Sequence, residues 1–173
     1  AAGEAFDKFA KMLGLPYPGG VEVDKRAQLG DPKAYSFPKP LIKEDNFNFS
    51  FSGLKSAAQR LLDDLSDEEI AQNLNDLCAS YQATVVKVLS TKLKRALQET
   101  GVKNFIVSGG VSANSGLRAS AENIAQQLNV GLALPPLRFC TDNAAMIGLV
   151  GLLRMQRGES SPQDLAPLPR APL

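Results

Sequence analysis

The turn at residues 108–114 is the segment of this sequence whose residue types best suit ligand binding. It reads Ser-Gly-Gly-Val-Ser-Ala-Asn, follows the apolar run Phe105–Val107, and precedes apolar residues at helical spacing. Glycine lets the backbone approach a ligand closely, and a helix start directs unpaired N–H groups at an anion or a polar base edge. The turn matches neither the Walker A loop nor the GxGxxG fingerprint. The pattern therefore fits a nucleotide-binding loop and also a tight structural turn.

The carboxylate of Asp142 is a candidate for binding a hard cation. It lies in the run Cys140-Thr141-Asp142-Asn143, where a helix is predicted to begin and where the helix dipole favours the ionised form. The plain alternative is that Thr141 or Asp142 caps this helix. The chain contains no histidine, which excludes His-ligated metal sites and Ser-His or Cys-His nucleophile pairs built from this chain alone. We therefore expect Cys140 to be a buried small hydrophobic residue.

Three other places in the chain carry groups that could contact a ligand, and each has a structural alternative. Asp7 lies on a predicted helix, where nearby lysines could pair with its carboxylate. Gly20 and Asp24 bracket the short helix that follows a loop containing two prolines and two glycines. The run Phe49–Lys55 joins aromatic side chains to a small polar turn and a cation. It could contact phosphate or simply begin a helix.

The composition is that of an ordinary globular domain. The 173 residues include 19 Lys plus Arg and 18 Asp plus Glu, so the formal net charge is +1, and 44% of the residues are hydrophobic. A near-neutral balance disfavours a surface that holds nucleic acid by charge alone. Two cysteines without a CxxC motif indicate a reducing compartment. We find no signal peptide and no apolar run long enough to cross a membrane, which predicts the cytoplasm or an organelle interior.

The elements that position these candidate groups are predicted to be mostly helical. Apolar spacing predicts helices over residues 1–13, 21–29, 54–65, 66–100 and 142–157. Ser66 and Glu69 have capping-box spacing at the start of the longest helix, and Gly101 ends it. Phe105–Val107 and Val130–Leu134 are expected to pair in parallel, because the helix between them permits a crossover connection.

The connection over residues 30–50 contains three prolines and is expected to be an ordered, irregular crossing. The aromatic side chains in and after it are expected to avoid water, namely Phe37, Phe47, Phe49 and Phe51. The proline-rich tail is expected to lie over the surface.

Five motifs, in order, resemble the C-terminal half of the TsaD (YgjD, Gcp) family. They are Gly3-Glu4-Ala5-Phe6-Asp7-Lys8, Leu15-Pro16-Tyr17-Pro18-Gly19-Gly20, Phe49–Lys55, Gly109-Gly110-Val111-Ser112-Ala113-Asn114 and Cys140-Thr141-Asp142-Asn143. The resemblance covers essentially the whole chain. It implies an α/β fold, a partial RNase H-like or actin-like ATPase (ASKHA) lobe, helix-rich with a short parallel sheet remnant. It also implies one domain over residues 1–158, with a helical insertion at about 52–100, and a proline-rich tail over 159–173.

The activity that the resemblance implies is that of a tRNA N6-adenosine threonylcarbamoyltransferase. Such an enzyme transfers the threonylcarbamoyl group from threonylcarbamoyl-AMP to N6 of adenine 37 in tRNAs that read codons beginning with A. The family positions that contact the adenylate correspond to Asp7, Gly20, Asp24, Gly110 and Asn114. We expect the Asn114→Ala change to weaken adenylate binding and to leave folding nearly intact.

The resemblance also implies one divalent metal ion, iron or zinc, for the full-length subunit. Asp142 matches its C-terminal ligand, and the histidine ligands lie upstream, outside this chain. ATP or threonylcarbamoyl-AMP is the implied ligand of the cleft.

The partners implied by the resemblance are tRNA, a TsaB-like paralogue, a TsaE-like ATPase and the missing N-terminal half of the same protein, without a membrane. The expected location is the cytoplasm, with the mitochondrial matrix as the alternative. The visible chain is expected to be a fragment that is inactive by itself. Two other functions stay open: a nucleotide-binding interaction module and a metal-dependent glycoprotein endopeptidase. The endopeptidase is the weaker of the two, because the sequence contains no HExxH motif.

Overall fold

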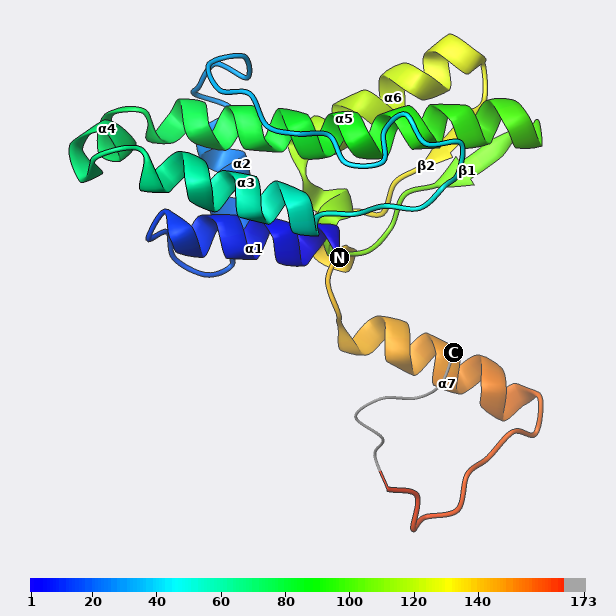
Figure 1. Ribbon diagram of the computed structural model, residues 1–173. Helices are drawn as coiled ribbons and strands as arrows, with labels where there is room; N and C mark the ends of the chain where they lie inside the picture. The colour runs from blue at the N-terminus through cyan, green and yellow to red at the C-terminus, as the bar shows by residue number, and fades with distance from the viewer. Residues whose placement is uncertain (167–173) are drawn as a thin grey trace. The chain divides into compact units, whose positions relative to one another are not determined.

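The computed structural model describes residues 1–166 of the chain (Figure 1). The chain divides after Cys140 into two compact units. This division falls inside the span 1–158 that the sequence predicts as one domain. In the predicted tail, residues 159–166 are exposed, and residues 167–173 lie outside the described part of the chain.

Helices form most of the first unit. They are α1 (Ala2–Met12), α2 (Gly19–Ala27), α3 (Ser52–Asp63), α4 (Asp67–Gln72), α5 (Leu74–Thr100) and α6 (Ser115–Leu128). Helix α5 is the long central element in Figure 1, and it packs against both α2 and α6. Helix α1 packs against α2 and α3. These contacts confirm the predicted helix-rich organisation.

Four aromatic rings form the centre of the core between α1, α5 and the irregular connection. The rings of Phe9 and Tyr81 stack with their centroids 3.8 Å apart, and Phe37 meets both of them edge-on. Phe6 contacts the edge of Tyr81, whose hydroxyl group donates a hydrogen bond to the carbonyl oxygen of Ala5 at 3.1 Å. Burial of each ring contributes roughly 1.5–3 kcal/mol to stability, so this cluster fixes α1 against α5.

The predicted long helix after Ser66 is interrupted. The predicted capping box is confirmed, because the Glu69 backbone N–H donates to Ser66 Oγ and the Ser66 N–H donates to Glu69 Oε2 at 2.8 Å. Helix α4 then ends at Asn73, whose side-chain amide donates to the carbonyl oxygen of Glu69 at 2.8 Å. Asparagine competes in this way with the backbone pattern of a continuing helix. Gly101 ends α5 as predicted, with a left-handed φ of 66°.

Two short strands form a parallel sheet, as predicted. Strand β1 (Asn104–Ile106) pairs with β2 (Gly131–Ala133), and the register places Phe105 opposite Leu132. Helix α6 supplies the crossover between them. Ile106 is 72% exposed, so one face of this strand pair is open to solvent in the described structure.

The connection between α2 and α3 is irregular, as predicted, but two of its aromatic side chains are not buried. Phe37 is buried, whereas Phe47 and Phe49 are each 47% exposed. Polar contacts from α5 hold this segment in place: the buried Lys92 ammonium group donates to the Asn46 carbonyl oxygen at 2.7 Å, and the Arg95 guanidinium lies 5.2 Å from the centre of the Phe47 ring. The expectation that all of these rings avoid water is therefore wrong.

The second unit contains helix α7 (Ala144–Gln156). Its cap is Asn143, whose side-chain oxygen accepts a hydrogen bond from the Met146 N–H at 3.1 Å. The prediction that Thr141 or Asp142 caps this helix is wrong, because asparagine one position later has the extended backbone that an N-cap requires. None of the helices in residues 1–166 combines the length and the apolar character needed to cross a membrane.

Candidate functional site

The predicted ligand-binding turn connects β1 to α6. Ser108, Gly109 and Gly110 are exposed, and residues Gly110–Ala113 form a short 3₁₀ turn. Gly109 has a φ of 85°, a left-handed conformation that favours glycine. The 3₁₀ turn is closed by a hydrogen bond from the Ser112 N–H to the Gly109 carbonyl oxygen at 2.9 Å. The turn therefore offers exposed main chain held in one conformation.

Gly110 is not explained by the packing of the described structure. A Cβ atom at this position would meet no other atom within 4 Å, and its φ lies outside the left-handed region. The fold by itself therefore does not require glycine at position 110. Close approach of a ligand to the backbone is one reason for a glycine at such a position, so the geometry is compatible with the nucleotide-loop interpretation.

Asp7 and Gly20, which the sequence predicts to share a ligand, lie next to each other. The Gly20 N–H donates to Asp7 Oδ1 at 3.3 Å. The close approach of α1 and α2 allows this contact, since a Cβ atom at Gly19 would lie 2.6 Å from the Cβ atom of Ala10. One of the nearby lysines, Lys8, pairs instead with Glu4. The Asp7 carboxylate is half-buried and faces the start of α2.

Asp24 and Asn114 are also brought together. Asp24 Oδ1 accepts hydrogen bonds from the Ser115 hydroxyl at 2.6 Å and from the Asn114 amide at 3.3 Å. The Ser115 N–H donates to Asp24 Oδ2 at 3.1 Å, so the carboxylate lies against the start of α6, where the helix dipole favours an anion. Gly20 and Asp24 are four residues apart and share one face of α2. That face therefore links the two pairs of predicted residues.

Asn114 is buried, and its amide group is largely occupied. Its side-chain oxygen accepts a hydrogen bond from the Leu117 N–H at 3.0 Å, which makes it the N-cap of α6. Its amide nitrogen donates to Gln82 Oε1 at 2.7 Å and to Asp24. Removal of an N-cap of this kind costs about 1 kcal/mol. The expectation that Asn114→Ala leaves folding nearly intact therefore conflicts with this geometry.

Two polar residues that the sequence reasoning missed support the turn. The Arg118 guanidinium donates from Nε to the Ser112 carbonyl oxygen at 2.7 Å, and its Nη2 atom lies 3.3 Å from Cys140 Sγ. The sequence signal that could have identified Arg118 is its position four residues after Asn114, which places both residues on the same face of the helix. Gln82 is a polar residue in the apolar stripe of α5, but the sequence pattern does not show which residues it is hydrogen-bonded to. Cys140 is buried, as predicted.

Asp142 belongs to the second unit and is exposed. Because Asn143 caps α7, the capping role does not occupy the Asp142 carboxylate. Within residues 1–166, no group of three or more histidine, cysteine or acidic residues is arranged to hold a metal ion. That Asp142 is one ligand of a metal ion stays a prediction.

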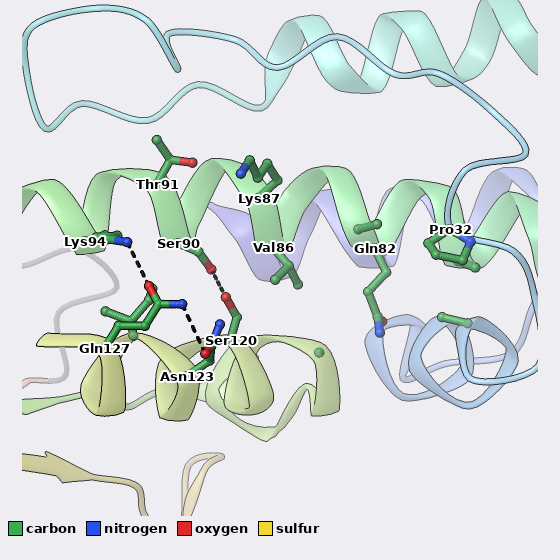
Figure 2. A pocket seen from close by; sticks show the side chains of 15 residues that line it. Pro32, Gln82, Val86, Lys87, Ser90, Thr91, Lys94, Ser120, Asn123 and Gln127 are labelled. Atoms are coloured by element: carbon green, nitrogen blue, oxygen red, sulfur yellow. Dashed lines mark hydrogen bonds between the residues drawn. The ribbon is translucent and has the colours of Figure 1, made fainter. Parts of the chain in front are cut away.

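A groove of about 590 Å³ lies between α5 and α6 (Figure 2). The charged side chains that line it are Lys87 and Lys94, and Lys94 donates to Gln127 Oε1 at 2.8 Å. The Ser90 and Ser120 hydroxyl groups are hydrogen-bonded across it at 2.7 Å. None of the predicted site residues lines this groove. The candidate site is therefore the junction of the turn with α1, α2 and α6, and not the groove.

Comparisons with known proteins identify the family of this chain. A family model described as TsaD, tRNA N6-adenosine threonylcarbamoyltransferase, matches residues 1–149. A protein of that name from Bdellovibrio bacteriovorus is 56% identical over 171 residues, which cover 99% of this chain and 50% of that protein. Proteins of the same name from Geotalea uraniireducens and Geobacter sp. (strain M21) are 46% and 49% identical, and the match covers 100% of this chain and 50% of each protein. The chain spans about half the length of these relatives.

Proposed function

The chain belongs to the TsaD family of tRNA N6-adenosine threonylcarbamoyltransferases, and we propose that it forms the C-terminal half of such an enzyme and supplies part of its substrate site. The full-length protein would transfer the threonylcarbamoyl group from threonylcarbamoyl-AMP to N6 of adenine 37 in tRNAs that read codons beginning with A. The observation that carries this proposal is the exposed glycine turn, whose Gly110 the fold itself does not require.

The adenylate would bind at the junction of the turn with α1 and α2. We assign its contacts to Asp7, Gly20, Asp24, Gly110 and Asn114. A carboxylate has two oxygens and about four acceptor sites, so Asp7 can keep its hydrogen bond from the Gly20 N–H and also accept one from a ribose hydroxyl. Asn114 keeps one acceptor site on its side-chain oxygen after capping α6. The exposed backbone at Gly110 would lie against the nucleotide.

Asp142 would supply one ligand to a divalent iron or zinc ion, with histidine ligands from the rest of the protein. Such an ion polarises a carbonyl group toward nucleophilic attack. The exposure of the Asp142 carboxylate, and the capping of α7 by Asn143 instead, support this role.

The partners proposed for the full-length protein are tRNA, a TsaB-like paralogue and a TsaE-like ATPase, in the cytoplasm or the mitochondrial matrix. For this chain by itself, a nucleotide-binding module without activity is the alternative. It is favoured by one observation: the turn and its supporting hydrogen bonds all lie within the first unit.

The proposal is tested by the Gly110→Val change in the full-length protein. Because a Cβ atom at position 110 meets no protein atom within 4 Å, we expect the free energy of unfolding to change by less than about 0.5 kcal/mol. Adenylate binding should weaken by about tenfold or more, because the side chain fills the space that the nucleotide needs. Calorimetry with ATP and mass spectrometry of the modified nucleoside in tRNA measure the two effects.

Ala71→Val in α4 is the control, since Ala71 is exposed and the change introduces the same side chain away from the turn. It should leave ATP affinity unchanged. Wild-type affinity in the Gly110→Val protein would show that no nucleotide approaches this turn.

A further inference from the structure

Gln82 is a buried polar residue on α5 that contacts Asp24 and Asn114, two residues of the candidate site. Its side chain is 7% exposed, and it lies among apolar neighbours of the α5 core face. Figure 2 shows it extending from α5 at one end of the groove, next to the blue ribbon of α2. Its amide nitrogen donates to Asp24 Oδ1 at 3.0 Å, and its amide oxygen accepts from Asn114 Nδ2 at 2.7 Å. Gln82 therefore joins α2 to the start of α6.

The direction of each hydrogen bond in this chain is set by the Asp24 carboxylate. An ionised carboxylate can only accept, so Gln82 must present its NH₂ group to Asp24. The Gln82 oxygen then faces Asn114 and requires the Asn114 NH₂ group as its donor. This leaves the Asn114 oxygen to accept from the backbone at the start of α6. One carboxylate thus fixes the orientation of two buried amides.

We propose that Gln82 is a positioning residue for the glycine turn. It holds the Asn114 amide, and through it the start of α6 and the turn at residues 109–113, in the conformation that receives the adenylate. Asn114 closes this turn directly, because its backbone N–H donates to the Val111 carbonyl oxygen at 3.0 Å. This inference rests on the proposed function, since its consequence is nucleotide affinity.

A second polar contact between the same two helices provides the control. Ser90 on α5 and Ser120 on α6 share a hydrogen bond of 2.7 Å, and Ser90 is 8% exposed. Neither residue is hydrogen-bonded to the turn. A purely structural role of Gln82 would make the Gln82 and Ser90 variants equivalent, with lower stability and unchanged nucleotide affinity.

The decisive variants exchange the acid and amide groups of Asp24 and Gln82 in the full-length protein. Gln82→Glu removes the donor to Asp24 and places a second carboxylate beside it. Adding Asp24→Asn places an amide NH₂ group on α2, and this group can donate to the carboxylate at position 82. The other oxygen of that carboxylate can still accept a hydrogen bond from the Asn114 amide. We expect Gln82→Glu to weaken ATP binding about tenfold, the effect of losing one hydrogen bond to a charged group. The double variant should bind ATP more tightly than Asp24→Asn alone, since both lack the Asp24 carboxylate and only the double variant restores a donor–acceptor pair with position 82.

Titration calorimetry with ATP, beside urea denaturation of each variant, measures affinity and stability separately. Ser90→Ala should retain wild-type ATP affinity. If Gln82→Glu does not fold, Gln82→Met, which keeps a similar volume and removes both hydrogen bonds, carries the same tenfold expectation.

Unchanged ATP affinity in a folded Gln82 variant overturns the inference, and so does a double variant that binds ATP no more tightly than Asp24→Asn alone. If Gly110→Val weakens ATP binding while the Gln82 variants do not, the inference alone fails and the proposed function stands. If the wild-type protein binds no ATP and Gly110→Val has no effect on transfer to tRNA, both fail.

Discussion

The side-chain amide of Asn114 caps helix α6 and is hydrogen-bonded to residues of α2 and α5. Its oxygen accepts from the Leu117 N–H, and its nitrogen donates to Gln82 and Asp24. A substitution at this residue therefore changes stability and site geometry together. Gly110 differs, because its side-chain position is open and no protein contact depends on it. Substitutions at Asn114 therefore test folding and the site together, whereas substitutions at Gly110 test ligand approach with little effect on folding.

Tyr81 gives a prediction about stability at high pH. Its side chain is fully buried, and burial raises its pKa above the ordinary value of 10.0. Folding therefore favours the neutral phenol, and this contribution to the free energy of unfolding is present below pH 10 and is lost as the pH rises further. We expect Tyr81→Phe to cost about 1 kcal/mol at neutral pH, from the lost hydrogen bond, and to reduce the loss of stability above pH 10.

Urea denaturation of the full-length protein at several pH values measures this effect. Tyr17→Phe is the control, because Tyr17 is 86% exposed and should not alter the pH dependence. Identical slopes of stability against pH for Tyr81→Phe and the wild type would contradict the prediction.

Among the helices, asparagine marks four of the boundaries. Asn73 lies between α4 and α5, Asn114 and Asn143 cap α6 and α7, and Asn129 ends α6 with a left-handed φ of 52°. Asparagine suits these places because its short amide hydrogen-bonds to nearby backbone groups and tolerates left-handed backbone. The lengths of these helices are therefore set by residues at their ends as well as by their apolar faces.

The C-terminus of α5 gives a prediction for a whole element. Gly101 ends the helix in left-handed backbone, and its N–H donates to the Leu97 carbonyl oxygen at 3.1 Å. Gly101→Ala should cost about 1 kcal/mol, because a Cβ atom is strained at positive φ even though nothing lies within 4 Å of it. Thermal denaturation measures the change. Gly101→Asn should cost less, and an equal cost for the two variants would contradict the role of the backbone conformation.

For the whole molecule, the apolar surface of α7 is informative. Seven of its large apolar side chains are 46–71% exposed, namely Met146, Ile147, Leu149, Val150, Leu152, Leu153 and Met155. A helix that is apolar around its circumference is typical of a protein interior. The chain spans about half the length of the curated relatives. We therefore expect the stability of this helix to depend on contacts made in the full-length protein.

The metal prediction also belongs to the whole molecule. In the full-length protein, Asp142→Ala should remove most of the bound divalent ion and most of the transfer activity, because the ion loses an anionic ligand. Elemental analysis of the purified protein measures metal content. Asp45→Ala, which changes a fully exposed carboxylate in the first unit, should retain the metal. Equal metal content in the wild type and Asp142→Ala would show that Asp142 is not a ligand.

The amino-acid sequence by itself determined most of the helices, the parallel strand pair, the capping box at Ser66 and the helix stop at Gly101, because periodicity and end signals act over a few neighbouring residues. The break at Asn73 was not predicted. It also indicated the family, through short motifs in a fixed order. The tertiary structure decided which polar groups meet. Asp24 and Asn114 are 90 positions apart, and Asp24 and Gln82 are 58 apart. No local signal joins such residues, since their contact depends on how α2, α5 and α6 pack. For the same reason, packing decided that Phe37 is buried while Phe47 remains half-exposed.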